Sequence, residues 1–137
     1  MKKDPLHLIN QASRQISKSF NDRFTPIGLY AAQWAIIRYL HIHGPSTQVQ
    51  MCTYLSVEAP TMTRTLKRLE NSRWIKRTEG TDRREKLISL TEETIDKMPD
   101  LLDQVESFRE PVYDLLTEEE IAVLTKSLEK IIYQLKQ

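Results

Sequence analysis

The sequence predicts a mainly α-helical chain with one small β-hairpin. Over most of the chain, apolar residues recur at spacings of three and four, as they do on one face of a helix. Only 3 of the 137 residues are glycines, so sharp turns are few. Residues 74–91 differ, because two short runs rich in strand-forming residues flank a glycine there.

Four helices are expected before the hairpin. The predicted ranges are 6–24, 30–43, 47–55 and 60–72. Gly44 and Pro45 are a typical helix end, and Pro60 suits a first helical turn. The second helix is the most apolar and should be the most buried. The short third helix is expected to turn one face inward, formed by Val49, Met51, Cys52 and Leu55.

Strands are expected at 74–79 and 86–91, joined by a charged loop. After Thr91, a plausible N-cap, the chain becomes acidic and helical. Prolines at 99 and 111 predict kinks or breaks in that helix. Thr117 and Glu120 form a capping box that opens the last helix.

This order of elements is that of a winged helix-turn-helix with additional terminal helices. We expect one structural domain with three regions: an N-terminal dimerisation helix (1–28), a winged helix-turn-helix DNA-binding region (29–91) and C-terminal dimerisation helices (92–137). The apolar stripes of the terminal helices are too narrow for a free monomer. Such stripes are typical of a helical dimer interface.

The formal net charge of +1 conceals an uneven distribution. Residues 60–90 carry nine bases and four acids, whereas residues 91–137 carry five bases and twelve acids. The first segment therefore has a charge of +5 and the second of −7. A basic segment joined to an acidic one indicates that only the basic segment binds a polyanion.

The predicted fourth helix places its basic residues on one face. At 100° per residue, Leu66 and Leu69 fall within about 40° of Met62, and all three should face the core. The opposite face has no acid and no large apolar side chain. It consists of Pro60, Arg64, Lys67 and Asn71, flanked by Thr61, Thr63 and Arg68. Such groups bind base edges and phosphates in a major groove, and Arg64 is placed to bind guanine.

The hairpin loop supplies a second basic element. It ends in Asp82, Arg83 and Arg84, where an arginine could enter a minor groove. Asp82 could accept a hydrogen bond from the guanidinium of Arg84 and hold it extended. A merely solvated basic face with a local ion pair is the alternative for both elements.

The sequence resembles the MarR family of bacterial transcriptional regulators over roughly residues 5–136. The resemblance is carried by Gln33-Trp34-Ala35-Ile36-Ile37, by Pro60-Thr61-Met62-Thr63-Arg64-Thr65-Leu66-Lys67-Arg68-Leu69-Glu70, by Asp82-Arg83-Arg84 and by Ile88-Ser89-Leu90-Thr91. Two residues depart from the family pattern. Arg73 and Thr94 stand where glycines are usual, so the turn at Arg73 is strained if φ is positive.

The resemblance implies a homodimer that binds an inverted-repeat operator, usually as a repressor. It implies that Thr61, Thr63, Arg64 and Lys67 lie in the major groove, and that Arg84 enters the minor groove with Asp82 as its partner. It also implies a small-molecule effector, whose pocket could be lined by Phe20, Tyr30, Trp34 and Arg38. The same aromatic residues could simply belong to the core. The effector, the operator sequence and the regulated genes are not predicted.

Several other classes are excluded. The chain has no signal peptide and no run of roughly 18–20 apolar residues that a membrane span needs. A single cysteine, Cys52, fits the reducing cytoplasm. No enzyme motif is present, and no cofactor or metal is expected. His41 and His43 suit a helix end better than a metal site, and Cys52 suits a core better than a redox switch. The alternative function is a winged-helix module that docks an acidic protein on its basic face.

Overall fold

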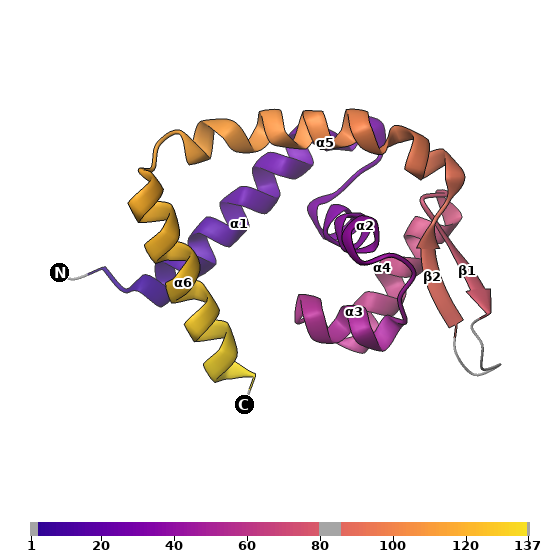
Figure 1. The fold of residues 1–137 in the computed structure, drawn as a ribbon, viewed down its shortest axis with the longest axis horizontal. Helices are drawn as coiled ribbons and strands as arrows, with labels where there is room; N and C mark the ends of the chain where they lie inside the picture. The colour runs from indigo at the N-terminus through magenta and orange to yellow at the C-terminus, as the bar shows by residue number, and fades with distance from the viewer. Residues whose placement is uncertain (1–2, 80–85, 137) are drawn as a thin grey trace. The chain divides into compact units, whose positions relative to one another are not determined.

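The computed structural model describes residues 3–79 and 86–136 (Figure 1). The chain divides into two compact units, Met1–Met98 and Pro99–Gln137. In the described residues the fold is mainly helical, with one antiparallel hairpin, and this confirms the predicted fold class.

The first unit contains most of the predicted elements. In chain order they are α1 (Pro5–Phe24), a 3₁₀ turn (Thr25–Ile27), α2 (Ala31–His43), α3 (Gln48–Leu55), α4 (Ala59–Asn71), β1 (Ile75–Glu79), β2 (Lys86–Leu90) and the beginning of α5 (Glu92–Tyr113). Each predicted boundary lies within one or two residues of the observed one.

Local chemistry fixes where the helices begin and end. The Leu6 amide donates to the Asp4 carboxylate (3.1 Å), which caps α1. Helix α2 ends at Gly44, whose φ of 78° suits a residue without a Cβ. Helix α3 opens with reciprocal bonds: the Gln50 amide donates to the Thr47 hydroxyl (3.2 Å), and the Thr47 amide donates to the Gln50 side chain (2.8 Å). These caps hold the start of α3 in a fixed position.

All the α-helices and both strands of the first unit contribute to its core. As predicted, α2 is the most buried helix. The side chains that are almost fully buried are Phe24, Leu29, Ile37, Met51, Met62, Leu66, Leu69, Ile75, Ile88 and Thr94. One expectation for α3 is wrong, because Val49 is 74% exposed while Met51 is fully buried. At 100° per residue these two side chains point about 160° apart, so they cannot share one face.

The hairpin pairs β1 with β2 in an antiparallel register that places Ile75 opposite Leu90 and Glu79 opposite Lys86. A third segment joins this small sheet. Ser46 forms a bridge with Ile88, in which each amide donates to the other's carbonyl oxygen (3.0 and 2.8 Å). The chain between α2 and α3 is thus tied to the hairpin.

The junction of α4 with β1 is bound to the start of α5. Arg73 adopts a φ of 64°, a conformation that favours glycine, and the turn is therefore strained. The Thr91 hydroxyl donates to the Arg73 carbonyl oxygen (2.8 Å). The buried Thr94 hydroxyl donates to the Trp74 carbonyl oxygen (2.7 Å). The Thr94 amide donates to the Thr91 hydroxyl (3.2 Å), which confirms Thr91 as the predicted cap. Thr94 therefore has a structural task that a glycine could not perform.

The second unit holds the rest of α5 and all of α6 (Glu118–Leu135). Of the kinks or breaks expected at Pro99 and Pro111, a break occurs at neither proline, because helix α5 runs through both. Each proline removes only one donor, and Pro111 lies in the last turn, where the helix is about to end. The predicted capping box is confirmed: the Glu120 amide donates to the Thr117 hydroxyl (3.1 Å), and the Thr117 amide donates to the Glu120 carboxylate (3.0 Å).

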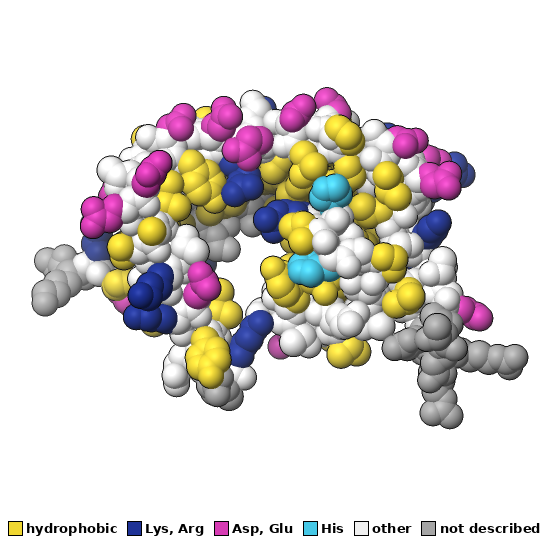
Figure 2. All heavy atoms as spheres, viewed as in Figure 1, with side chains coloured by type: hydrophobic (Ala, Val, Ile, Leu, Met, Phe, Trp, Pro, Cys, Tyr) yellow, Lys and Arg dark blue, Asp and Glu magenta, His cyan; other side chains and the backbone are white. Residues whose placement is uncertain are grey.

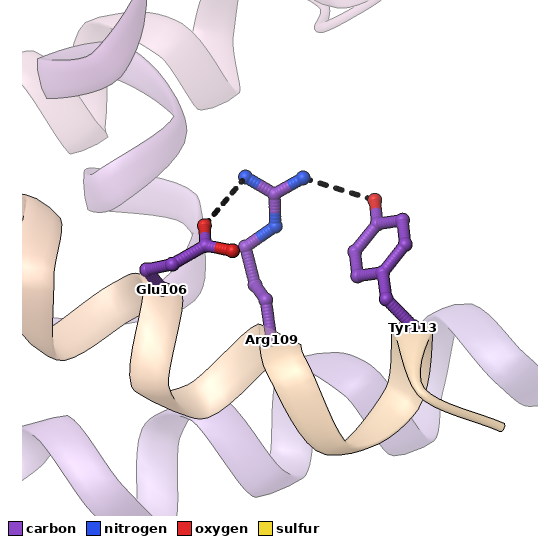
Figure 3. A network of polar contacts seen from close by, with 3 residues as sticks. All are labelled: Glu106, Arg109 and Tyr113. Carbon is purple, nitrogen blue, oxygen red and sulfur yellow. Dashed lines mark hydrogen bonds and ion pairs between the residues drawn. The ribbon is translucent and has the colours of Figure 1, made fainter.

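Acidic side chains gather along α5 (Figure 2). Near its end, Arg109 donates to the Tyr113 hydroxyl (2.9 Å) and lies 3.9 Å from the Glu106 carboxylate (Figure 3). These groups are exposed, so the ion pair contributes little to stability. Helix α6 has no fully buried residue and exposes Val123, Leu124, Ile132 and Leu135.

The strained turn at Arg73 leads to a prediction about stability. A non-glycine residue at positive φ costs about 1–2 kcal/mol, and a glycine there loses about 0.5–1 kcal/mol in chain entropy. We expect Arg73→Gly to raise the free energy of unfolding by roughly 0.5–1 kcal/mol in urea titrations. Arg73→Ala is the control, because it removes the charge and keeps the Cβ. Equal stability of the two variants would contradict the strain.

Candidate nucleic-acid interface

Helices α3 and α4 form a helix-turn-helix. Helix α3 ends at Leu55, and Ser56 adopts a left-handed conformation with a φ of 56°. The Val57 amide then donates to the Cys52 carbonyl oxygen (3.1 Å), and α4 begins at Ala59. Three residues thus reverse the chain, as is typical of this motif. The predicted helix-turn-helix is confirmed.

Helix α4 is divided sharply into a buried and an exposed side. Met62, Leu66 and Leu69 are each fully buried, as the helical spacing predicts. Every predicted residue of the opposite face is exposed. We call this the basic face of α4: Pro60, Thr61, Thr63, Arg64, Lys67, Arg68 and Asn71. The structure therefore brings all the α4 site residues predicted from sequence onto one accessible surface.

In residues 3–79 and 86–136, no ion pair neutralises a cation of the basic face. Among the described residues, neither Arg64 nor Lys67 has a carboxylate within ion-pair distance. Arg64 instead donates to the Thr61 hydroxyl (3.3 Å), one turn earlier on α4. This contact leaves most of the guanidinium donors of Arg64 available for an external acceptor.

Side-chain contacts at the surface hold α4 to α3 and to β1. The Gln48 amide nitrogen, on α3, donates to the Thr63 hydroxyl (2.7 Å). At the other end of α4, the Arg77 Nε atom lies 3.3 Å from the Glu70 carboxylate and links α4 to β1. Sequence reasoning found neither contact. Gln48 and Thr63 are 15 residues apart, and only the crossing of α3 over α4 brings them together.

The second predicted basic element belongs to the loop between β1 and β2. Strand β1 ends at Glu79, and strand β2 begins at Lys86. Asp82, Arg83 and Arg84 lie outside the described residues. The hairpin that should carry them is present, as predicted.

The predicted effector residues occupy two kinds of environment. Phe20 and Trp34 are buried, whereas Tyr30 and Arg38 are exposed. A cavity of about 220 Å³ lies elsewhere in the first unit and includes none of the four. It is lined by Leu40, His41, Gly44, Pro45, Ser89, Leu90 and Ile95.

The candidate sensor residues form no metal cluster. Within residues 3–79 and 86–136, no group of three or more His, Cys, Asp or Glu side chains could hold a metal ion. The His43 ring instead stacks on Tyr39, with 4.2 Å between ring centroids, and its Nδ1 atom lies 3.1 Å from the Tyr39 carbonyl oxygen. Cys52 is a half-buried free thiol. No helix in the same ranges is both long and apolar enough to cross a membrane.

Known proteins are similar to this chain in sequence and in fold. The family model described as MarR family matches residues 27–85. The HTH-type transcriptional regulator YwoH of Bacillus subtilis is 45% identical over 105 residues, which cover 77% of this chain and 77% of YwoH.

Solved structures agree with the sequence comparison. A mutant of MarR from E. coli complexed with operator DNA is 25% identical, with a TM-score of 0.81 and 91% of each chain covered. The S. aureus MepR–DNA complex is 22% identical and has a TM-score of 0.85, covering 98% of this chain and 99% of MepR. The transcriptional regulator SlyA is 22% identical and has a TM-score of 0.88, covering 97% of this chain and 94% of SlyA. The chain belongs to the MarR family of transcriptional regulators, which are DNA-binding winged-helix proteins.

Proposed function

We propose that the protein is a homodimeric repressor that binds an inverted-repeat operator through the basic face of α4. One observation carries this proposal: an acid-free helix face, whose cations pair with no carboxylate in the described part of the chain, lies opposite a fully buried apolar stripe. A major groove admits such a helix, and phosphates attract its charge. MarR and MepR, which share the fold, have been crystallised with DNA.

Each residue of the basic face has a proposed role. Arg64 lies at the centre and binds the O6 and N7 atoms of a guanine. Lys67 and Arg68 bind phosphates, while Thr61 and Thr63 contact base edges. At the wing, Arg83 and Arg84 would enter the minor groove, with Asp82 orienting Arg84.

The dimer would form through residues 1–28 and 92–137. Helix α1 exposes Leu6, Leu8 and Ile16, and α6 exposes apolar side chains along its length. Exposed apolar side chains in such numbers favour a partner surface. The charge of −7 on residues 91–137 would keep this region away from DNA. A twofold dimer places its two α4 helices about one DNA turn apart, which explains an inverted repeat.

A small molecule is the proposed signal that releases the DNA. Phe20, Tyr30, Trp34 and Arg38 would line its pocket, where the guanidinium of Arg38 favours an anionic ligand. The protein would act in the cytoplasm by binding alone, without catalysis or a cofactor.

The test is a gel-shift titration of the full chain against its own upstream DNA at two salt concentrations. We expect a sequence-preferring shift that weakens steeply as salt rises, because phosphate contacts release counterions. If no sequence-preferring shift occurs at moderate salt, the proposal fails. An acidic protein would then be the better candidate partner of the basic face.

Removal of the central arginine should weaken specific binding. We expect Arg64→Ala to cost about 1–3 kcal/mol in operator affinity and to relax the preference at one base pair per half-site. Fluorescence anisotropy with operator and substituted duplexes measures both effects. Unchanged affinity for the operator would remove Arg64 from the interface.

A phosphate contact should appear in the salt dependence. We expect Lys67→Ala to weaken binding to all duplexes similarly and to reduce the slope of log K against log salt by about one per subunit. Lys126→Ala is the matched control, since Lys126 is an exposed lysine of α6. An unaltered slope for Lys67→Ala, or an equal change in both variants, would contradict the assignment.

A further inference from the structure

Gln48 reaches from the first residue of α3 onto α4. Its Nε2 atom lies 2.7 Å from the Thr63 hydroxyl oxygen and 3.5 Å from the Ala59 carbonyl oxygen. A carbonyl oxygen only accepts, so the side-chain atom that faces both groups is the amide nitrogen rather than the amide oxygen. The reciprocal caps of Thr47 and Gln50 fix the backbone from which this side chain extends.

The Thr63 hydroxyl is therefore fully engaged as a donor. Its single proton goes to the Ala59 carbonyl oxygen, 2.9 Å away, and one lone pair accepts from Gln48. A hydroxyl has one proton and two lone pairs, so Thr63 has no donor left. A phosphate oxygen or a guanine O6 or N7 atom needs a donor and cannot be bound by this hydroxyl.

Thr61 has the opposite chemistry, although it too flanks the centre of the basic face, two residues earlier. Its hydroxyl oxygen accepts from Arg64 (3.3 Å). No acceptor in the described part of the chain takes its proton. Thr61 can therefore donate to DNA, whereas Thr63 cannot. The difference between the two threonines comes from Gln48 and from the carbonyl group of Ala59.

We infer that Gln48 is a positioning residue for base recognition, holding Thr63 so that the γ-methyl group of Thr63 contacts the methyl group of a thymine. Protein groups take the proton and one lone pair of the Thr63 hydroxyl, so this hydroxyl has no donor for DNA and the methyl is the branch that can recognise a thymine. Contact between a threonine methyl and a thymine C5-methyl is an established form of apolar base recognition. This inference rests on the proposed function, because it requires α4 to lie in the major groove.

A double-mutant cycle tests the inference with the full chain. The DNA is the duplex that the wild-type protein selects from a random library. Affinities are measured for wild type, Gln48→Met, Thr63→Ala and the double variant. Each is measured on this duplex and on duplexes in which deoxyuridine replaces one thymine at a time, which removes only the methyl group. Methionine keeps the length of Gln48 without its amide.

We expect one thymine per half-site at which deoxyuridine weakens wild-type binding by about threefold to fivefold, the effect of one buried methyl group. Thr63→Ala should abolish this difference, and Gln48→Met should reduce it. In the Thr63→Ala background, Gln48→Met should have no further effect, because Gln48 acts only through Thr63. Thr65→Ala is the matched control: the Thr65 hydroxyl also donates to a carbonyl one turn earlier, that of Thr61 (3.0 Å). This control should leave the deoxyuridine effect intact.

Two results would overturn the inference while leaving the proposed function in place. One is a selected duplex at which no deoxyuridine substitution changes affinity. The other is an effect of Gln48→Met that persists in the Thr63→Ala background, which would mean that Gln48 binds DNA itself. If the wild-type chain selects no duplex at all, the proposed function fails and the inference fails with it.

Discussion

The burial of one side of α4 is the constraint on which the rest of the structure depends. Met62, Leu66 and Leu69 are fully buried, and a helix cannot turn one face inward without turning the opposite face outward. Loss of any of these side chains would leave a cavity, which costs several kcal/mol. The core thus fixes the rotation of α4 about its axis. That rotation decides which seven residues form the basic face.

A second set of contacts fixes how the neighbouring elements are arranged around α4. Ser46 ties the chain before α3 to β2, and Thr94 ties the start of α5 to the chain just before β1. The ion pair of Glu70 with Arg77 joins α4 to β1. The backbone hydrogen bonds and the buried Thr94 hydroxyl contribute most to this arrangement, since an ion pair at the surface contributes little. The hairpin is therefore held in a defined relation to α4.

The periodicity of apolar residues predicted the order of the elements and both sides of α4, because burial of α4 follows the helical repeat directly. It failed for Val49, since Val49 and Met51 point about 160° apart on α3 and cannot both face inward. The proline at 99 predicted a kink or a break, and no break occurs, because a single missing donor does not break a long helix. The role of Gln48 could not be predicted, because it depends on a contact between helices 15 residues apart in sequence. The strain at Arg73 was foreseeable only through the glycine expected there.

The central claim is that the basic face of α4 meets DNA, and lysine acetylation measured by mass spectrometry tests it most directly. Lys67 lies on that face, whereas Lys126 and Lys130 lie on α6, and all three are exposed. With operator DNA present, acetylation of Lys67 should slow strongly, while that of Lys126 and Lys130 should not change. Equal acetylation of Lys67 with and without bound DNA would contradict the account.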